Sequence, residues 1–165
     1  MKAAPIPAND QQRLQALRDL LILDTPAEER FDKLVAFAAG EFDMPIALIS
    51  LVDENRQWFK AKVGLTTCET SRDISFCAHA LESPDFLIVP DTRADERFKD
   101  NPQVTGDPLM RFYAGAPLVL PSGHVAGTLC LIDQKPRQLD PLDLSILGAL
   151  RDLALNELVR EHRGA

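Results

Sequence analysis

Apolar residues recur with a helical period near both ends of the chain and with a strand period between them. The first predicted helix covers residues 9–23, with Asn9 or Asp10 as its cap. One face of this helix carries leucines at helical spacing, namely Leu14, Leu17, Leu20 and Leu21. The pattern predicts a helix that buries one side.

A second helix is predicted to start in a capping box. Thr25 and Glu28 have the spacing of such a box, and Pro26 stands at the first helical position. Gly40 is expected to end the helix. The predicted buried face consists of Phe31, Leu34, Val35, Ala38 and Phe42.

The last helix is predicted over residues 139–162, with Asp140 as cap and Pro141 at the first helical position. Its apolar stripe is broader than contact with one sheet face requires. The stripe holds Leu142, Ile146, Leu147, Leu150, Leu153, Ala154, Leu158 and Val159. We therefore expect this helix to contact another helix as well as the sheet.

Strand patterns fill the middle of the chain. They lie at residues 45–52, 57–63, 86–90, 111–120 and 125–133. Short turns join the first pair and the last pair as hairpins, which predicts a mostly antiparallel sheet. Residues 64–73 form a polar loop that leads to a short helix over SFCAHAL.

This element order predicts an α+β fold with a single, mostly antiparallel sheet of five or six strands. The terminal helices should cover one face of the sheet. The short helix and the connecting loops should cover the other. The chain length fits one domain over residues 1–165, with an N-terminal helix in 1–21, a core in 22–133 and a C-terminal helix in 139–162.

Composition and charge exclude several classes of protein. The net charge is −7 and the basic residues are dispersed, which argues against nucleic-acid binding. No apolar run reaches the roughly 20 residues that span a bilayer, and the N-terminus has no apolar signal core. Three cysteines without CxxC spacing favour neither a disulfide framework nor a zinc site. We expect a cytoplasmic protein with no metal, no cofactor and no membrane partner.

Four stretches of the chain resemble the GAF domain family. They are residues 23–65, the segment RDISFCAHAL, the segment VPDTRADERFKDNPQVTG, and residues 111–133. The resemblance is to the bacterial subgroup found at the N-terminus of sensor histidine kinases and diguanylate cyclases. It implies the α+β fold with a ligand cavity, whose wall is the central helix and whose lid is the long connection after residue 90.

The central segment places Cys77 and His79 two residues apart. In a helix such residues point in nearly opposite directions, so they cannot form a nucleophile–base pair. Ile74, Cys77, Ala78 and Leu81 follow one apolar stripe, which favours a packed Cys77. His79 shares its face with Ser75 and adjoins Phe76. The family resemblance makes Ser75, Phe76, Cys77 and His79 candidate ligand contacts.

Alternation along the strands supplies further candidates. Arg111 and Tyr113 are expected on the cavity side of their strand, with Phe112, Ala114, Ala116 and Leu118 facing the helices. Thr128 and Cys130 share a face, and Ser50 is a polar position among apolar ones. Of Trp58 and Phe59, which lie on opposite faces, one is expected in the core and the other exposed.

The connection over residues 91–108 has the mixed charge of a solvated loop. As the lid of a GAF cavity it would bring four further residues to a ligand, namely Asp91, Arg97, Phe98 and Asn101. Arg97 or Arg111 suits a carboxylate or a phosphate.

The leading functional hypothesis is a regulatory domain without enzymatic activity. It would sense a small molecule and pass the signal through its terminal helices to a kinase or cyclase output domain, or across a homodimer. A closed cavity with a purely dimerising role is a variant of this hypothesis.

Three alternatives remain open at this point. A free methionine-R-sulfoxide reductase would use cavity cysteines, and Cys68 with Cys77 echoes that arrangement. A bilin photoreceptor would use Cys77 as anchor, although Ala78 separates it from the histidine that usually follows. Cyclic-nucleotide binding has less support, because the NKFDE pattern of those GAF domains is missing.

Overall fold

The computed structural model describes residues 2–164, with side chains described as far as residue 160. Its centre is a six-stranded antiparallel sheet with the strand order β3-β2-β1-β6-β5-β4. The strands are β1 (Ile46–Val52), β2 (Arg56–Val63), β3 (Glu69–Ser71), β4 (Leu87–Val89), β5 (Phe112–Val119) and β6 (Val125–Asp133). The predicted α+β class with one antiparallel sheet is confirmed. The short strand β3 lies in a segment that had been predicted as loop.

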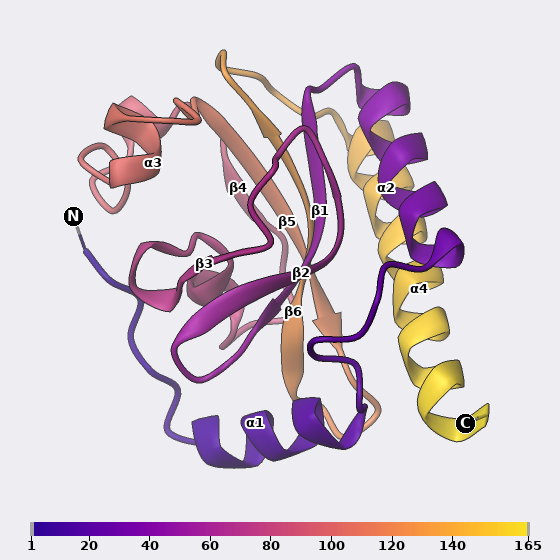
Figure 1. Ribbon diagram of the computed structural model, residues 1–165. Helices are drawn as coiled ribbons and strands as arrows, with labels where there is room; N and C mark the ends of the chain where they lie inside the picture. The colour runs from indigo at the N-terminus through magenta and orange to yellow at the C-terminus, as the bar shows by residue number, and fades with distance from the viewer. Residues whose placement is uncertain (1, 165) are drawn as a thin grey trace.

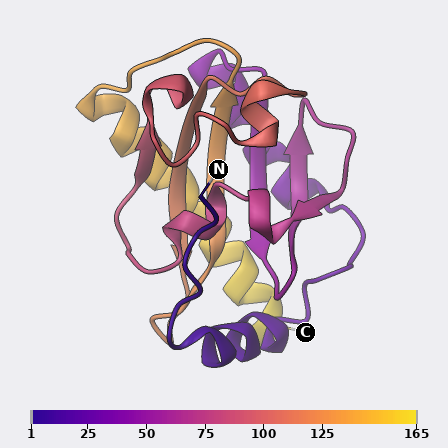
Figure 2. The same cartoon turned by 90° about the vertical axis from the view of Figure 1, so that its left-hand side faces the viewer.

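Two layers of helix and loop enclose the sheet. Helices α2 (Glu29–Phe42) and α4 (Pro141–Gly164) lie side by side over one face, and α1 (Asp10–Asp19) lies at one end of the sheet (Figure 1). The opposite face carries helix α3 (Pro102–Thr105) and three short 3₁₀ turns (Figure 2). These turns are η1 (Arg72–Ile74), η2 (Cys77–Ala80) and η3 (Thr92–Ala94).

Strand alternation divides the interior into two apolar cores. In β5, Phe112, Ala114, Ala116 and Leu118 pack under the helices, whereas Tyr113 belongs to the core on the other face. This division was predicted. Trp58 joins the helix-side core and Phe59 the opposite one, but both are buried. The expectation that one of them is exposed is therefore wrong.

Helix α2 differs from its prediction at both ends. It begins at Glu29, and no side chain caps it. The Thr25 hydroxyl instead donates to the carbonyl of Ile22, and Glu28 pairs with the buried ammonium of Lys60. The Glu28 carboxylate thus neutralises Lys60, and the Thr25 hydroxyl accepts a hydrogen bond from the same ammonium. The helix also continues past Gly40 to Phe42, because the buried Phe42 extends its apolar face and Asp43 makes the left-handed turn.

The sequence predicted the start of α4 correctly, but the end it predicted for α1 was wrong. Helix α1 ends at Asp19, and Leu21 has a positive φ of 55° and is exposed, so Leu21 does not belong to the buried stripe. Asp10 does not cap the helix but takes part in a buried ion cluster. At α4 the predicted start is confirmed, since the backbone N–H of Asp143 donates to the Asp140 carboxylate.

The segment SFCAHAL is not one helix. Ser75 is extended, and the only helical part of the segment is the 3₁₀ turn η2, while η1 lies just before it. The Ser75 hydroxyl accepts from the backbone N–H of Ala78 and so supports the start of η2. Within the described residues, none of the helices combines the length and apolar character that crossing a bilayer needs.

Candidate ligand-binding site

A cavity of about 210 Å³ lies on the sheet face opposite α2 and α4. Its floor comes from β1, β2, β5 and β6, and its walls from the loop before β3, the segment from η1 to η2, and α3 with the residues that follow it. The lining consists of Leu48, Gln57, Phe59, Leu65, Thr66, Thr67, Thr70, Ile74, Phe76, Cys77, Gln103, Asp107, Pro108, Met110, Tyr113, Cys130 and Ile132.

A cluster of hydroxyl and thiol groups lies at the buried end of the cavity. The Cys77 Sγ is 3.0 Å from the Tyr113 hydroxyl and 3.0 Å from Thr128 Oγ1, and those two oxygens are 3.3 Å apart. The Tyr113 ring can lie flat along its strand because Gly115 has no Cβ to meet the phenol. All three groups of the cluster are almost fully buried.

This cluster shifts the acidity of its members in opposite directions. Burial acts to raise the pKa of Cys77, but hydrogen bonds from Cys130, Thr128 and Tyr113 outweigh it and lower that pKa to about 6. Burial and the neighbouring Cys77 raise the pKa of Tyr113. The hydrogen bond to Cys77 and burial raise the pKa of Cys130. Cys77 is therefore the member of the cluster that ionises first.

Gln57 organises the next part of the wall. Its side-chain oxygen accepts hydrogen bonds from the hydroxyls of Ser50 (3.1 Å) and Ser75 (2.7 Å), and its amide donates to Thr70 (2.6 Å). Gln57 lies on β2 two residues before Phe59 and faces the same side. This network joins β1, β2, β3 and the segment before η2.

Seven of the predicted site residues lie at the cavity or directly behind it. Phe76, Cys77, Tyr113 and Cys130 line it. Ser50, Ser75 and Thr128 do not reach the lining but hydrogen-bond to residues that do.

His79 and Phe98 lie outside the lining. The His79 ring meets Phe98 edge-on, with ring centroids 4.7 Å apart, and Phe98 stacks on Phe76 at 4.0 Å. Burial lowers the pKa of His79 below its usual value. His79 makes no contact with Cys77 that would pair them as base and nucleophile, as the local geometry predicted.

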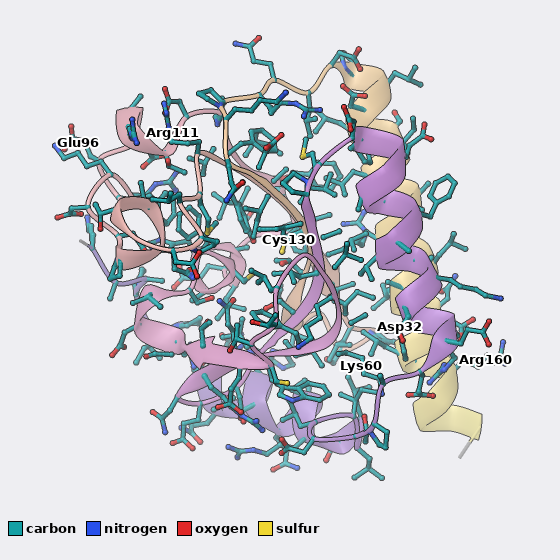
Figure 3. All side chains as sticks on the ribbon, turned by 45° about the horizontal axis from the view of Figure 1, so that its top comes forward. Asp32, Lys60, Glu96, Arg111, Cys130 and Arg160 are labelled. Atoms are coloured by element: carbon teal, nitrogen blue, oxygen red, sulfur yellow. The ribbon has the colours of Figure 1, made fainter. Side chains whose placement is uncertain are left out.

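The four remaining candidates, which are charged or amide side chains, also lie outside the lining. Asp91 caps η3 and pairs with Arg111 at 3.1 Å. Arg97 pairs with Asp95 at 2.8 Å. Asn101 caps α3 and donates to the carbonyl of Ile74. In Figure 3, Arg111 lies toward the edge of the molecule, away from Cys130. These side chains hold the lid segments in place.

Sequence reasoning missed most of the polar lining. The missed residues are Gln57, Thr66, Thr67, Thr70, Gln103 and Asp107. Strand alternation with Phe59 could have identified Gln57, whereas the other five come from loops, the three-residue strand β3 and a one-turn helix, whose path no periodicity reveals. Among the described residues, no group of His, Cys, Asp and Glu is arranged to hold a metal ion.

Residues 26–158 match the GAF domain family. A curated relative is the cyclic di-GMP phosphodiesterase of Pseudomonas aeruginosa, 43% identical over 157 residues, which are 95% of this chain. The chain spans only 25% of the length of that relative.

Solved structures resemble the fold at much lower identity. The GAF domain of a phosphoenolpyruvate-protein phosphotransferase from Acinetobacter is 18% identical with a TM-score of 0.65, over 93% of this chain and 96% of that one. The free methionine-R-sulfoxide reductase of Neisseria meningitidis is also 18% identical with a TM-score of 0.65, over 99% of both chains. At this identity the likeness concerns the fold alone.

One expectation is overturned by these comparisons. The sequence had been interpreted as a protein without enzymatic activity, yet the curated relative carries the name of an enzyme. The matched part of that relative is a quarter of its length, so the name describes a larger protein. The family match over most of the chain and the antiparallel α+β sheet agree with each other, and the chain therefore belongs to the GAF domain family.

Proposed function

We propose that the chain is the small-molecule-sensing regulatory domain of a bacterial signalling protein, and that its terminal helices pass on the occupancy of the cavity. The observation that carries this proposal is a cavity, largely enclosed by the sheet and its lid, whose wall is tied by side chains to helix α1. The cavity supplies the binding site, and the tie supplies a route for the signal.

The cavity has the features of a small-ligand site. It combines an apolar lining with a few polar groups whose positions are fixed by hydrogen bonds, as ligand sites generally do. The lid over it is held by caps and ion pairs rather than by apolar packing alone.

The route from the cavity to α1 starts at Arg72, the first residue of η1. Its guanidinium donates to both carboxylate oxygens of Asp10 at 3.0 Å. Asp10 also accepts from Nε of Arg13 at 2.9 Å. Arg13 in turn donates to the carbonyls of Val52 and Val125, at the ends of β1 and β6. A ligand that shifts the segment 72–77 would therefore bias the position of α1.

The output of this signal is proposed from the curated relative. Because that relative is a cyclic di-GMP phosphodiesterase, we propose that the domain adjusts cyclic di-GMP turnover in a longer protein. A homodimer through the terminal helices belongs to the same proposal. Leu142 and Leu153 support it, since both are exposed and lie three turns apart on one face of α4.

The rival chemistries have weaker support. Cys77 and Cys130 line the cavity, but Cys68, the second cysteine of the predicted reductase arrangement, is exposed and outside the lining. A bilin is a larger molecule than the drug-sized ligands that occupy pockets of roughly 300 Å³ or more. The cavity volume therefore gives the photoreceptor reading no support.

Native mass spectrometry of the purified chain tests the proposal. We expect a bound small molecule, or one that binds when a mixture of metabolites is added, and its mass should be lost on denaturation. Gln103→Trp should abolish this binding because the larger side chain fills the cavity. Thr105→Trp, on the exposed side of the same short helix, should leave it intact. Equal binding by both variants, or none by the wild-type chain, would contradict the proposal.

A further inference from the structure

The described lining of the cavity carries an acidic side chain but no basic one. Among the described residues that line it, Asp107 is the only one with a permanently charged side chain, and it is exposed at the mouth. Lys62, three residues before the lining residue Leu65, does not itself line the cavity. Its ammonium is held by the carbonyls of Thr66 and Thr67 and by the Cys68 sulfur.

The other basic side chains nearby lie outside the lining and are paired with carboxylates, although the buried Nε of Arg111 has no hydrogen-bond partner among the described residues. Arg72 binds Asp10, Arg97 binds Asp95, and Arg111 binds Asp91. The chain as a whole carries a net charge of −7. An anion entering this cavity would lose its hydration and find no cation to replace it.

The buried end of the cavity favours an uncharged group. Tyr113 and Cys77 line this end and offer a hydroxyl and a thiol that donate or accept as their hydrogens rotate, and Thr128 hydrogen-bonds to both from behind. They can therefore bind a ring N–H, a hydroxyl or a carbonyl. If Cys77 ionises, a negative group here would also meet a negative sulfur.

Size and lining limit the ligand further. An engineered apolar cavity of about 150 Å³ binds benzene. A cavity of about 210 Å³ has room for one ring system with a short side chain. Eight apolar side chains surround that space beside the Tyr113 ring, namely Leu48, Phe59, Leu65, Ile74, Phe76, Pro108, Met110 and Ile132.

We infer that the cavity selects a compact, largely apolar ring compound that is neutral or carries an amine, and that it rejects carboxylates and phosphates. The amine would lie at the mouth opposite Asp107, and a neutral polar atom would reach the Tyr113 cluster. This inference rests on the proposed sensing function and names its ligand class. It also means that cyclic di-GMP itself, with two phosphates, is not the compound sensed here.

Three compounds that share one ring system test whether the cavity prefers an amine to a carboxylate. Tryptamine, indole and indole-3-acetate differ in charge but share the indole body. Amide NMR titrations report both the dissociation constant and the place of binding. We expect tryptamine to bind roughly tenfold more tightly than indole-3-acetate, with indole between them, and shifts centred on Thr70, Ile74, Gln103 and Met110.

Two variants separate the local charge from the overall charge. Asp107→Asn should reduce the tenfold preference to within about threefold, consistent with the modest strength of an exposed ion pair. Asp85→Asn removes one negative charge from an exposed residue outside the lining and should preserve the preference. A preference that survives Asp107→Asn would overturn the role of Asp107.

The outcomes distinguish the ligand class from the sensing function. Tighter binding of indole-3-acetate, or cavity shifts caused by cyclic di-GMP, would overturn the ligand class while the sensing function stands. Failure of all the probes at millimolar concentration, while native mass spectrometry shows an anionic ligand that Gln103→Trp abolishes, would do the same. Failure of the probes together with no bound molecule would overturn both.

Discussion

Cys77 is the residue at which packing and chemistry meet. It is buried like a small apolar side chain, yet its sulfur contacts two hydroxyl groups at 3.0 Å. The same contacts that fix its position also stabilise its thiolate. A residue can thus be part of the core and still present an ionisable atom to a ligand.

The acidity of Cys77 is open to direct measurement. In a Cys68→Ser background, alkylation of Cys77 by iodoacetamide should accelerate as the pH rises through about 6, because the thiolate is the nucleophile. Mass spectrometry between pH 5 and 8 follows the rate. Cys130→Ala should move the midpoint upward, because the hydrogen bond from Cys130 contributes most to the lowering. A midpoint near the ordinary thiol value of 9 would contradict this account.

Asp10 is a second residue whose ionisation matters, here for the stability of the fold. Burial acts to raise its pKa, but the hydrogen bonds and charges of Arg72 and Arg13 lower it overall. Asp10 therefore stabilises the fold above the ordinary pKa of 3.8, and this stabilisation is lost as the pH falls through its lowered value.

Asp10→Ala should lower the free energy of unfolding by about 3–5 kcal/mol, since it leaves the buried Arg13 without its partner. Urea unfolding at pH 7 measures the loss. Asp19→Ala, at the exposed end of the same helix, should cost less than about 0.5 kcal/mol. Equal losses in the two variants would show that the buried cluster is not what stabilises α1.

At the scale of elements, the sequence pattern predicted the long paired strands but not the short segments that cover the cavity. The alternation from Phe112 to Leu118 predicted both faces of β5. By contrast, η1, η2 and α3 are each four residues or shorter, too short for any periodicity. The capping box at Thr25–Glu28 was misinterpreted because its partners, Lys60 and Ile22, are distant in sequence or outside the box. Most polar lining residues were not predicted because they also lie on loops or on elements too short to show a periodicity.

Two glycines, Gly127 in the sheet and Gly40 in α2, test how closely other atoms approach the backbone at each position. A Cβ on Gly127 would collide with the backbone of Ser50 and Leu51, so Gly127→Ala should force β6 away from β1. We expect a loss of about 1–3 kcal/mol in the free energy of unfolding. Gly40→Ala, in the open interior of α2, should instead gain about 0.5–1 kcal/mol. Thermal unfolding of both variants measures the contrast, and a destabilised Gly40→Ala would contradict the packing described for α2.

At the scale of the whole molecule, the sheet separates two functions. Helices α2 and α4 fill one face (Figure 1), and the cavity lies on the other face under short turns and loops. Helix α1 is at the end of the sheet, where it can respond to the cavity side through Arg72 and to the strand ends through Arg13. The central claim is that a ligand bound in the cavity stabilises helix α1.

Hydrogen–deuterium exchange tests that claim most directly. Exchange would be followed in residues 10–19 and 72–81, with and without saturating amounts of the compound that binds the cavity most tightly. The account predicts slower exchange in both segments of the wild-type chain. In Arg72→Met, only residues 72–81 should slow, because the tie to Asp10 is gone. Protection confined to residues 72–81 in the wild-type chain would contradict the claim.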